Sequence, residues 1–314
     1  MHQASGRALY GFCLALTTAV LWGMLPIALK IVLTDLTANT INWVRCFAAG
    51  PFVAVVLYKH NSLPSLAKAR GKVLKLLIIA VVGLLLNYIL YLVGLSLLTA
   101  ETAQVVIQLA PFLMMLGGIF IFREHLLLWQ RIGAVLLMVG LLLFFNDRLL
   151  LLLTQFGQDS YGVLLVIVAA VTWAAYALAQ KQLLMTYNSQ QIMLFIYVAG
   201  AISFLPLAEW APLATMSGLH WALLLFCCLN TIVAYGAFAE ALQHWEASKV
   251  SAVLAITPLL TILFANLVSW IWPDAPAAQP LNVWSIAGAC MVVVGSAVTA
   301  LAPLLKQYRA RQQA

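Results

Sequence analysis

Amide, phenol and guanidinium side chains lie inside long apolar stretches of this sequence, where a polar group needs a partner. Gln104 and Gln108 are four residues apart, which places both amides on one face of a helix. Such groups bind ligands through hydrogen bonds, and aromatic rings beside them can hold an apolar group or a cation. Because polar side chains are costly in a bilayer, they are candidates to line a cavity. The candidate substrate-binding residues are Asn42, Arg45, Asn87, Tyr88, Tyr91, Gln104, Gln108, Trp173, Tyr176, Gln180, Asn230 and Tyr235.

Two interpretations of these polar residues stay open at the level of single positions. A lone amide or phenol more commonly joins two helices, and such an interhelical hydrogen bond in a membrane is worth about 0.6 kcal/mol. The set nevertheless comes from several separate apolar segments of the chain. We therefore expect that the group as a whole surrounds a substrate cavity.

Arg45 is a full charge placed deep inside one of the apolar segments. Insertion scales put the cost of an arginine at the centre of a membrane helix at about 2.5 kcal/mol or more. The side chain can hold the carboxylate of a substrate. Alternatively, it lies about two turns from the outer helix end and extends toward the interface or pairs with a neighbour.

The sequence lacks the residue groupings of enzyme, metal and cofactor sites. Its five histidines, His2, His60, His125, His220 and His244, stand apart and lie mostly in connecting segments. No HExxH, GxSxG or CxxC motif occurs, so we expect no catalytic residue, no metal site and no cofactor. The five cysteines lie in apolar stretches and are interpreted as small apolar residues.

Composition restricts the class of protein further. The chain has 314 residues, of which 65% are hydrophobic and 8% are charged, whereas soluble domains carry about 25% charged residues. This argues against a soluble enzyme, and the basic residues are too dispersed to form a nucleic-acid groove. We expect a lipid bilayer and a small-molecule substrate as partners, and no nucleic acid. The oligomeric state stays open, with a monomer as the simplest case.

Apolar segments of about 20 residues are long enough to cross a bilayer as helices. They predict an all-α polytopic membrane protein with both termini in the cytoplasm. In that orientation thirteen basic residues face the cytoplasm and two face outward, which is the positive-inside pattern. The run Leu149–Leu153 either extends the fifth helix or lies in the outer interface. The ten predicted transmembrane helices are 8–32, 38–58, 74–98, 102–122, 129–146, 160–183, 189–208, 219–242, 249–272 and 282–303.

The second half of the sequence repeats the first. Nine residues in three ordered blocks recur at separations of 151, 147 and 155 residues. An odd number of helices per half inverts the second half relative to the first, an architecture that suits alternating access. We predict five-helix repeats at 8–146 and 160–303 and a basic cytoplasmic tail at 304–314. The matched pairs are Gly11 with Gly162, Trp22 with Trp173, Lys30 with Lys181, Leu95 with Leu242, Ala100 with Ala247, Pro111 with Pro258, Trp129 with Trp284, Gly133 with Gly288 and Gly140 with Gly295.

Two prolines occupy equivalent positions inside predicted helices of the two halves. Pro111 and Pro258 each remove a backbone hydrogen bond and bend the helix. We interpret them as paired hinges. A fixed bend that serves packing is the alternative.

Three segments carry a resemblance to a known family. They are Leu21–Lys30 (LWGMLPIALK), Gly94–Pro111 (GLSLLTAETAQVVIQLAP) and Ala241–Pro258 (ALQHWEASKVSAVLAITP). Because these motifs occur in this order and are duplicated, the chain resembles the EamA family of the drug/metabolite transporter superfamily over about residues 8–303. The second half departs from the family where Trp272–Pro273–Asp274 replaces its usual Gly-Glu pair; the first half has Arg123–Glu124 there.

The resemblance implies ten helices in a bacterial inner membrane and transport of small metabolites, commonly by export. Family substrates include amino acids and their relatives, and some toxic cations. Efflux of cationic or aromatic drugs is therefore the alternative function. A channel, a passive scaffold or a membrane-embedded enzyme is more remote.

Overall fold

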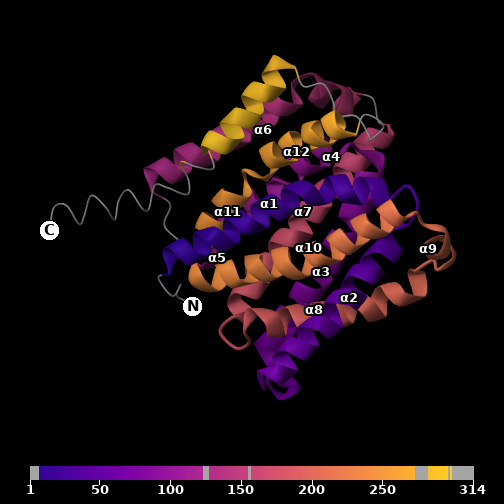
Figure 1. The fold of residues 1–314 in the computed structure, drawn as a ribbon. Helices are drawn as coiled ribbons and strands as arrows, with labels where there is room; N and C mark the ends of the chain where they lie inside the picture. Colours follow the sequence, from indigo (N-terminus) through magenta and orange to yellow (C-terminus); the bar gives the residue numbers. More distant parts are fainter. Residues whose placement is uncertain (1–6, 123–126, 155–156, 273–281, 296–297, 299–314) are drawn as a thin grey trace.

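The computed structural model describes residues 7–122, 127–154, 157–272, 282–295 and 298, and this part of the chain is helical without a β-strand. Figure 1 shows α1 lying between α10 on one side and the α11–α12 pair on the other. The first half comprises α1 (Ala8–Val32), α2 (Ala38–Lys59), the short turn η1 (Leu66–Lys68), α3 (Gly71–Leu97), α4 (Ala100–Val106), α5 (Leu109–Phe122) and α6 (Leu128–Thr154). The second half comprises α7 (Gln158–Leu183), α8 (Ser189–Phe204), η2 (Leu205–Leu207), α9 (Ala211–Thr215), α10 (Gly218–His244), α11 (Ala247–Leu254), α12 (Thr257–Ile271) and a last helix, Val283–Gly295.

Within the described residues, seven helical segments are long and apolar enough to cross a membrane, and three shorter apolar helices accompany them. The shorter ones, Leu128–Phe144, Thr257–Ile271 and Val283–Gly295, fall in the fifth, ninth and tenth predicted spans. The ten-span count and the cytoplasmic placement of the termini stay predictions. The predicted tail and the end of the last span lie outside the described residues.

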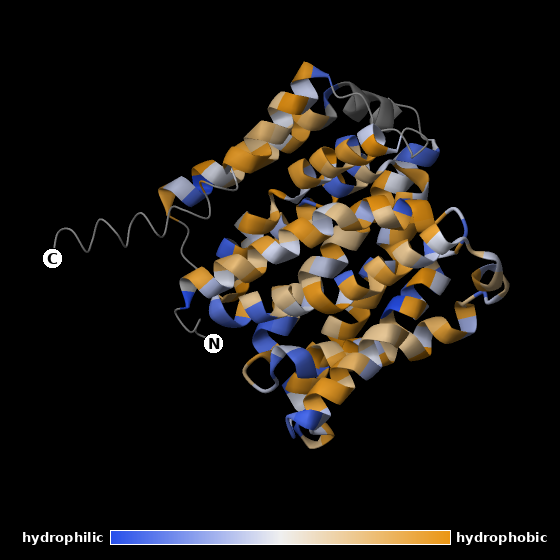
Figure 2. Cartoon of the chain, viewed as in Figure 1, coloured by the Kyte–Doolittle hydropathy of each residue, from blue (hydrophilic) through white to orange (hydrophobic). Residues whose placement is uncertain are grey.

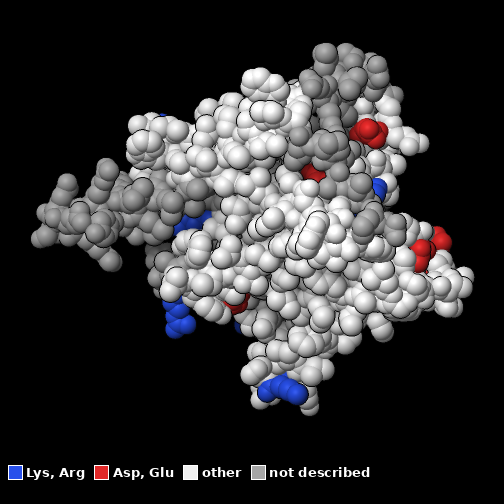
Figure 3. Space-filling model, turned by 45° about the horizontal axis from the view of Figure 1, so that its top comes forward, with Lys and Arg blue, Asp and Glu red and all other residues white. Residues whose placement is uncertain are grey.

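The outer surface of the helices is apolar, as a lipid-facing surface requires. Large side chains such as Phe120 and Trp270 are about four-fifths exposed, and hydrophobic residues cover the long helices in Figure 2. Figure 3 shows few charged side chains on the face drawn, and most of them lie near its edges. This distribution matches a bundle whose middle lies in hydrocarbon.

Two of the predicted helices, 102–122 and 249–272, are each interrupted in their first half, although 102–122 still falls in one apolar segment long enough to cross a membrane. α4 ends at Val106 before α5 begins, and α11 ends at Leu254 before α12 begins. The cause is the proline that follows each break, which has no N–H for the carbonyl four residues earlier.

Other donors take over at both breaks. The carbonyl of Ile107, which Pro111 leaves free, accepts from the backbone N–H of Ala110 at 2.8 Å. The carbonyl of Leu254, which Pro258 leaves free, accepts from the Thr257 hydroxyl. Neither carbonyl is left without a donor, so the breaks are stable features of the bundle.

The fifth predicted span, 129–146, ends at a kink, and helical backbone continues beyond it. α6 continues past 146 to Thr154, with a non-helical backbone at Asn146 (φ 9°, ψ −99°). The Leu149–Leu153 run is therefore part of this helix beyond the kink. Asn146 donates from Nδ2 to Oδ1 of Asn282 at 3.1 Å, which ties the kink to the start of the last helix.

The most extensive helix pairings are α3 with α7 and α1 with α10. At one end of each pairing a glycine allows close approach: a Cβ at Gly11 would lie 3.1 Å from Cβ of Trp245, and a Cβ at Gly162 would lie 2.9 Å from Cγ of Leu98. Gly162 follows Gly11 by 151 residues, and Trp245 follows Leu98 by 147. The Gly11–Trp245 contact and the Gly162–Leu98 contact are therefore equivalent to each other under the sequence repeat.

Candidate functional site

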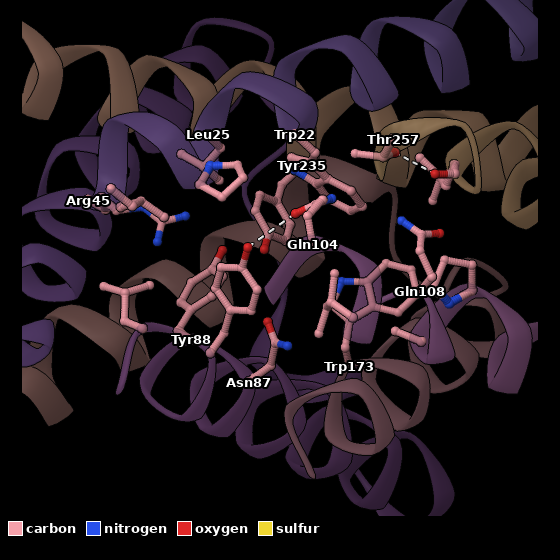
Figure 4. Close-up of a pocket in the computed structure, with 18 residues that line it drawn as sticks. Trp22, Leu25, Arg45, Asn87, Tyr88, Gln104, Gln108, Trp173, Tyr235 and Thr257 are labelled. Atoms are coloured by element: carbon pink, nitrogen blue, oxygen red, sulfur yellow. Dashed lines mark hydrogen bonds between the residues drawn. The ribbon is translucent and has the colours of Figure 1, made fainter. Parts of the chain in front are cut away.

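A pocket lies where helices of both halves meet at the middle of the bundle. Residues of α1, α2, α3, α4, α5, α7, α10, α11 and α12 line it (Figure 4). The cavity has a volume of ≈ 70 Å³. Eight of the twelve predicted residues line it: Arg45, Asn87, Tyr88, Tyr91, Gln104, Gln108, Trp173 and Tyr235.

Arg45 supplies a positive charge to this pocket. The side chain is 1% exposed, and its Nε donates to Oγ1 of Thr231 at 2.8 Å. One Nη donates to Oδ1 of Asn42 at 3.2 Å, and the guanidinium carbon lies 4.8 Å from the ring centroid of Tyr88. In the part of the chain that the structure describes, Arg45 forms no salt bridge with an Asp or Glu. The pocket therefore contains a buried cation held by neutral groups.

Aromatic rings form the middle of the pocket, and they meet in pairs. The indoles of Trp22 and Trp173 are edge to face with centroids 5.7 Å apart. The phenol rings of Tyr88 and Tyr235 meet in the same way at 5.4 Å. Because the members of each pair are repeat equivalents, separated by 151 and 147 residues, each ring packs against its counterpart from the other half.

The amides in the pocket differ in how far their hydrogen bonds are satisfied. Oε1 of Gln104 accepts from the Tyr91 hydroxyl at 3.1 Å, and Nδ2 of Asn87 donates to the carbonyl of Ala169 at 2.9 Å. Oε1 of Gln108 is buried and has no partner, and the hydroxyl of Tyr88 has none either. Gln108, Tyr88 and Nε1 of Trp22, which is buried without a partner as well, thus have hydrogen-bonding capacity left for a ligand.

The structure places four predicted residues outside the pocket lining: Asn42, Tyr176, Gln180 and Asn230. Asn42 holds Arg45, so it acts on the pocket through that side chain. Tyr176 donates to Sδ of Met193 at 3.5 Å, and Asn230 donates to the carbonyl of Leu21 at 2.6 Å. Gln180 is fully buried away from the pocket, and both its amide atoms lack partners. Tyr176 and Asn230 therefore join helices, the alternative interpretation of the sequence.

Trp22, Thr257 and Thr231 were missing from the predicted set. Trp22 and Thr257 line the pocket, and Thr231 holds Arg45 from α10. A signal for Trp22 was present, because it is the repeat equivalent of Trp173. Thr231 is one hydroxyl within an apolar helix, and the sequence carries no sign of its partner. Pro111 lines the pocket, whereas Pro258 is buried beside it in α12.

The two repeat-equivalent lysines have different surroundings. Nζ of Lys30, near the end of α1, donates to the carbonyls of Leu95 and Ser96 at 2.9 Å each. These carbonyls belong to the last turn of α3, whose helix dipole favours a cation there. Nζ of Lys181, near the end of α7, lies 4.8 Å from the ring centroid of Phe122.

Metal ligation finds no support within the described residues, where no three His, Cys, Asp or Glu side chains are grouped. The arrangement in the pocket offers one guanidinium, several hydrogen-bonding groups and a wall of aromatic rings. Such a set binds a small molecule without covalent chemistry.

Comparison with known proteins agrees with the resemblance seen in the sequence. The family description "EamA-like transporter family" matches the chain twice, at residues 9–146 and 160–301. An uncharacterized transporter of Haemophilus influenzae is 42% identical over 96% of this chain and 98% of its own length. The uncharacterized inner membrane transporter YhbE of Escherichia coli K12 is 40% identical over 96% of this chain and 93% of its own length. One crystal structure matches with a TM-score of 0.67 at 18% identity, covering 95% of this chain and 98% of that one, which supports the fold alone.

Proposed function

Because this chain belongs to the EamA-like transporter family and lies in the bacterial inner membrane as a multi-pass protein, we propose that it exports small metabolites. The substrates are amino acids or related compounds, and they cross by alternating access through the central pocket between the two five-helix repeats. The family and its relatives support transport as such; the cargo, the direction and the mechanism are our proposal.

The ring pairs at the centre of the pocket carry this proposal. Trp22 with Trp173 and Tyr88 with Tyr235 are contacts between repeat equivalents. If the halves are inverted copies, these contacts lie on the axis that relates them. A substrate held there stays in place while the halves exchange conformations and the access route changes from one side of the membrane to the other.

The bundle departs from this symmetry at its two ends, as a single state of an alternating-access cycle requires. α1 packs directly against α4, and Lys30 holds the end of α3 at the same end of α1. The equivalent pairing of α7 with α11 is not comparably extensive in the described residues. With the termini in the cytoplasm, the contact of α1 with α4 and the Lys30 hydrogen bonds lie at the outward-facing end of the bundle.

Efflux of cationic or aromatic drugs is the second candidate function, and the aromatic wall of the pocket favours it. The charge of Arg45 disfavours its cationic form, because a guanidinium repels a second cation strongly where water is scarce. Of the two candidates, the pocket therefore fits metabolite transport better.

Counterflow in liposomes tests the proposal. The protein is reconstituted into vesicles preloaded with unlabelled compound, and entry of the labelled compound is followed for amino acids, related metabolites and a cationic dye. Candidate compounds come from a screen of metabolites released by cells that overproduce the protein. We expect saturable counterflow of a metabolite. A channel would not saturate in this way and a scaffold would give no flux, and either result would overturn the proposal.

A further inference from the structure

The buried charge of Arg45 points to the chemical class of the substrate. We propose that the pocket binds a compound with a single carboxylate, whose oxygens accept hydrogen bonds from Arg45 while its apolar or aromatic body lies against the paired rings of Trp22 and Trp173. This inference rests on the proposed function, since it takes the pocket as the transport site. It adds that the cargo carries one carboxylate, so that compounds without a carboxylate are disfavoured.

The guanidinium of Arg45 is held in position before any ligand arrives. Thr231 of α10 accepts from Nε, and Asn42, three residues earlier on α2, accepts from one Nη. These bonds use two of the five N–H donors of an arginine and leave others for a ligand. A guanidinium whose plane is held in this way loses little freedom when it forms a forked pair with a carboxylate.

The burial of the Arg45 charge favours an anionic ligand. A buried cation without a counterion is unfavourable in a low-dielectric setting, and a carboxylate at hydrogen-bond distance removes most of that cost. Arg45 is 1% exposed, so little water is available to stabilise its charge. The substrate would therefore act as the counterion that this part of the protein lacks.

The number of positive charges in the pocket limits the ligand to one negative charge. Arg45 is the one Lys or Arg among the residues that line it. Lys30 lines a separate small pocket with Glu101, and its Nζ already donates to two carbonyls. A phosphate ester with two negative charges would need a second cation, so a carboxylate fits better.

The far side of the pocket offers a second point of recognition. Figure 4 shows Arg45 and Gln108 on opposite sides, with the rings of Trp22, Trp173 and Tyr235 between them. The amide of Gln108 is 2% exposed and its Oε1 has no partner. A polar group at the end of the substrate remote from its carboxylate would bind there. The pocket thus fits a compact molecule with an apolar middle and polar ends.

Three compounds of nearly the same shape but different charge test this proposal: benzoate, benzamide and benzamidine. Binding to the purified protein in lipid nanodiscs is measured by calorimetry at neutral pH. We expect benzoate to bind more tightly than benzamide, and benzamidine to bind weakest. Tighter binding of benzamide or benzamidine than of benzoate would overturn the proposal, as would binding of none of the three at millimolar concentration.

Substitution of Arg45 assigns the preference to this residue. We expect Arg45→Gln to raise the dissociation constant of benzoate about 10- to 100-fold and to leave that of benzamide nearly unchanged. Arg45→Lys, which keeps the charge and loses the fork, should fall between the two. The control is Arg131→Gln, which removes an exposed arginine of α6. If Arg45→Gln weakens the binding of benzoate and benzamide equally, its fold is damaged and the Arg45→Lys variant then decides. Unchanged benzoate binding in Arg45→Gln overturns the proposal.

Failure of this inference can be told apart from failure of the proposed function. Saturable counterflow of a neutral or cationic compound, with no preference for benzoate in binding, would retain transport and remove the monocarboxylate assignment. Absence of counterflow for every compound, with benzoate bound at Arg45, would remove transport and retain the anion site. The two measurements therefore address separate statements.

Discussion

The indole rings of Trp22 and Trp173 meet edge to face at the centre of the bundle, with their centroids 5.7 Å apart. One belongs to α1 and the other to α7, and the two residues are 151 positions apart in the repeat. Tyr235 extends this contact, since its ring centroid lies 5.0 Å from that of Trp22. The most polarizable surface of the pocket is thus made jointly by both halves.

Removing either indole should weaken substrate binding by a similar amount. An aromatic pair contributes about 0.5–1.5 kcal/mol beyond its buried area, which corresponds to a two- to tenfold change in affinity. We expect Trp22→Ala and Trp173→Ala each to raise the half-saturating substrate concentration in counterflow, and Trp22→Phe to raise it less. Trp129→Ala, at an exposed position of α6, serves as the control. A large effect of Trp173→Ala with none of Trp22→Ala would contradict a shared site.

Close packing of α3 on α7 should make Gly83 intolerant of a side chain. A Cβ at this position would lie 2.8 Å from the carbonyl oxygen of Thr172, and backbone cannot move aside easily. We expect Gly83→Ala to reduce the free energy of unfolding by about 1–3 kcal/mol. Gly236→Ala is the matched control, because a Cβ there meets nothing within 4 Å. Thermal unfolding in detergent compares them, and equal midpoints would contradict the packing described.

Much of the helical layout could be predicted from the sequence, because an apolar run of bilayer length has few other structures available to it. The breaks within the fourth and ninth predicted spans could not. Pro111 and Pro258 indicate a bend, but the place where α4 and α11 end depends on which donors reach the freed carbonyls of Ile107 and Leu254. Those donors are known only once the local backbone is folded.

The candidate site was predictable in part for a similar reason. Polar residues in apolar segments mark the helix faces that avoid lipid, and eight of the twelve candidates line the pocket. The same rule also selects polar residues that pack against another helix, and it cannot distinguish these from residues that line the pocket. Tyr176 therefore entered the set although its hydroxyl contacts Met193. Trp22 was not in the set, although its repeat partner Trp173 was.

The two prolines should influence the rate of transport more than the affinity for substrate. We expect Pro111→Ala and Pro258→Ala to restore the missing backbone hydrogen bonds and to straighten the breaks, which would slow the exchange of conformations. Pro258 is the cleaner position, because it does not line the pocket. Initial counterflow rates and half-saturating concentrations are compared with wild type. Wild-type rates in both variants would mean that the breaks are fixed bends that serve packing.

Loss of the Lys30 contacts should open the end of the bundle that we place toward the periplasm. Nζ of Lys30 bridges α1 to the carbonyls of Leu95 and Ser96, and charge-assisted bonds of this kind are worth about 1.5–3 kcal/mol, enough to shift a two-state equilibrium tenfold or more. We expect Lys30→Met to increase labelling of a Leu29→Cys reporter, which lines the pocket, by a membrane-impermeant thiol reagent on intact cells. Lys75→Met, at an exposed position of α3, should leave the labelling unchanged. Equal labelling with and without Lys30 would mean that these bonds only hold the end of α3.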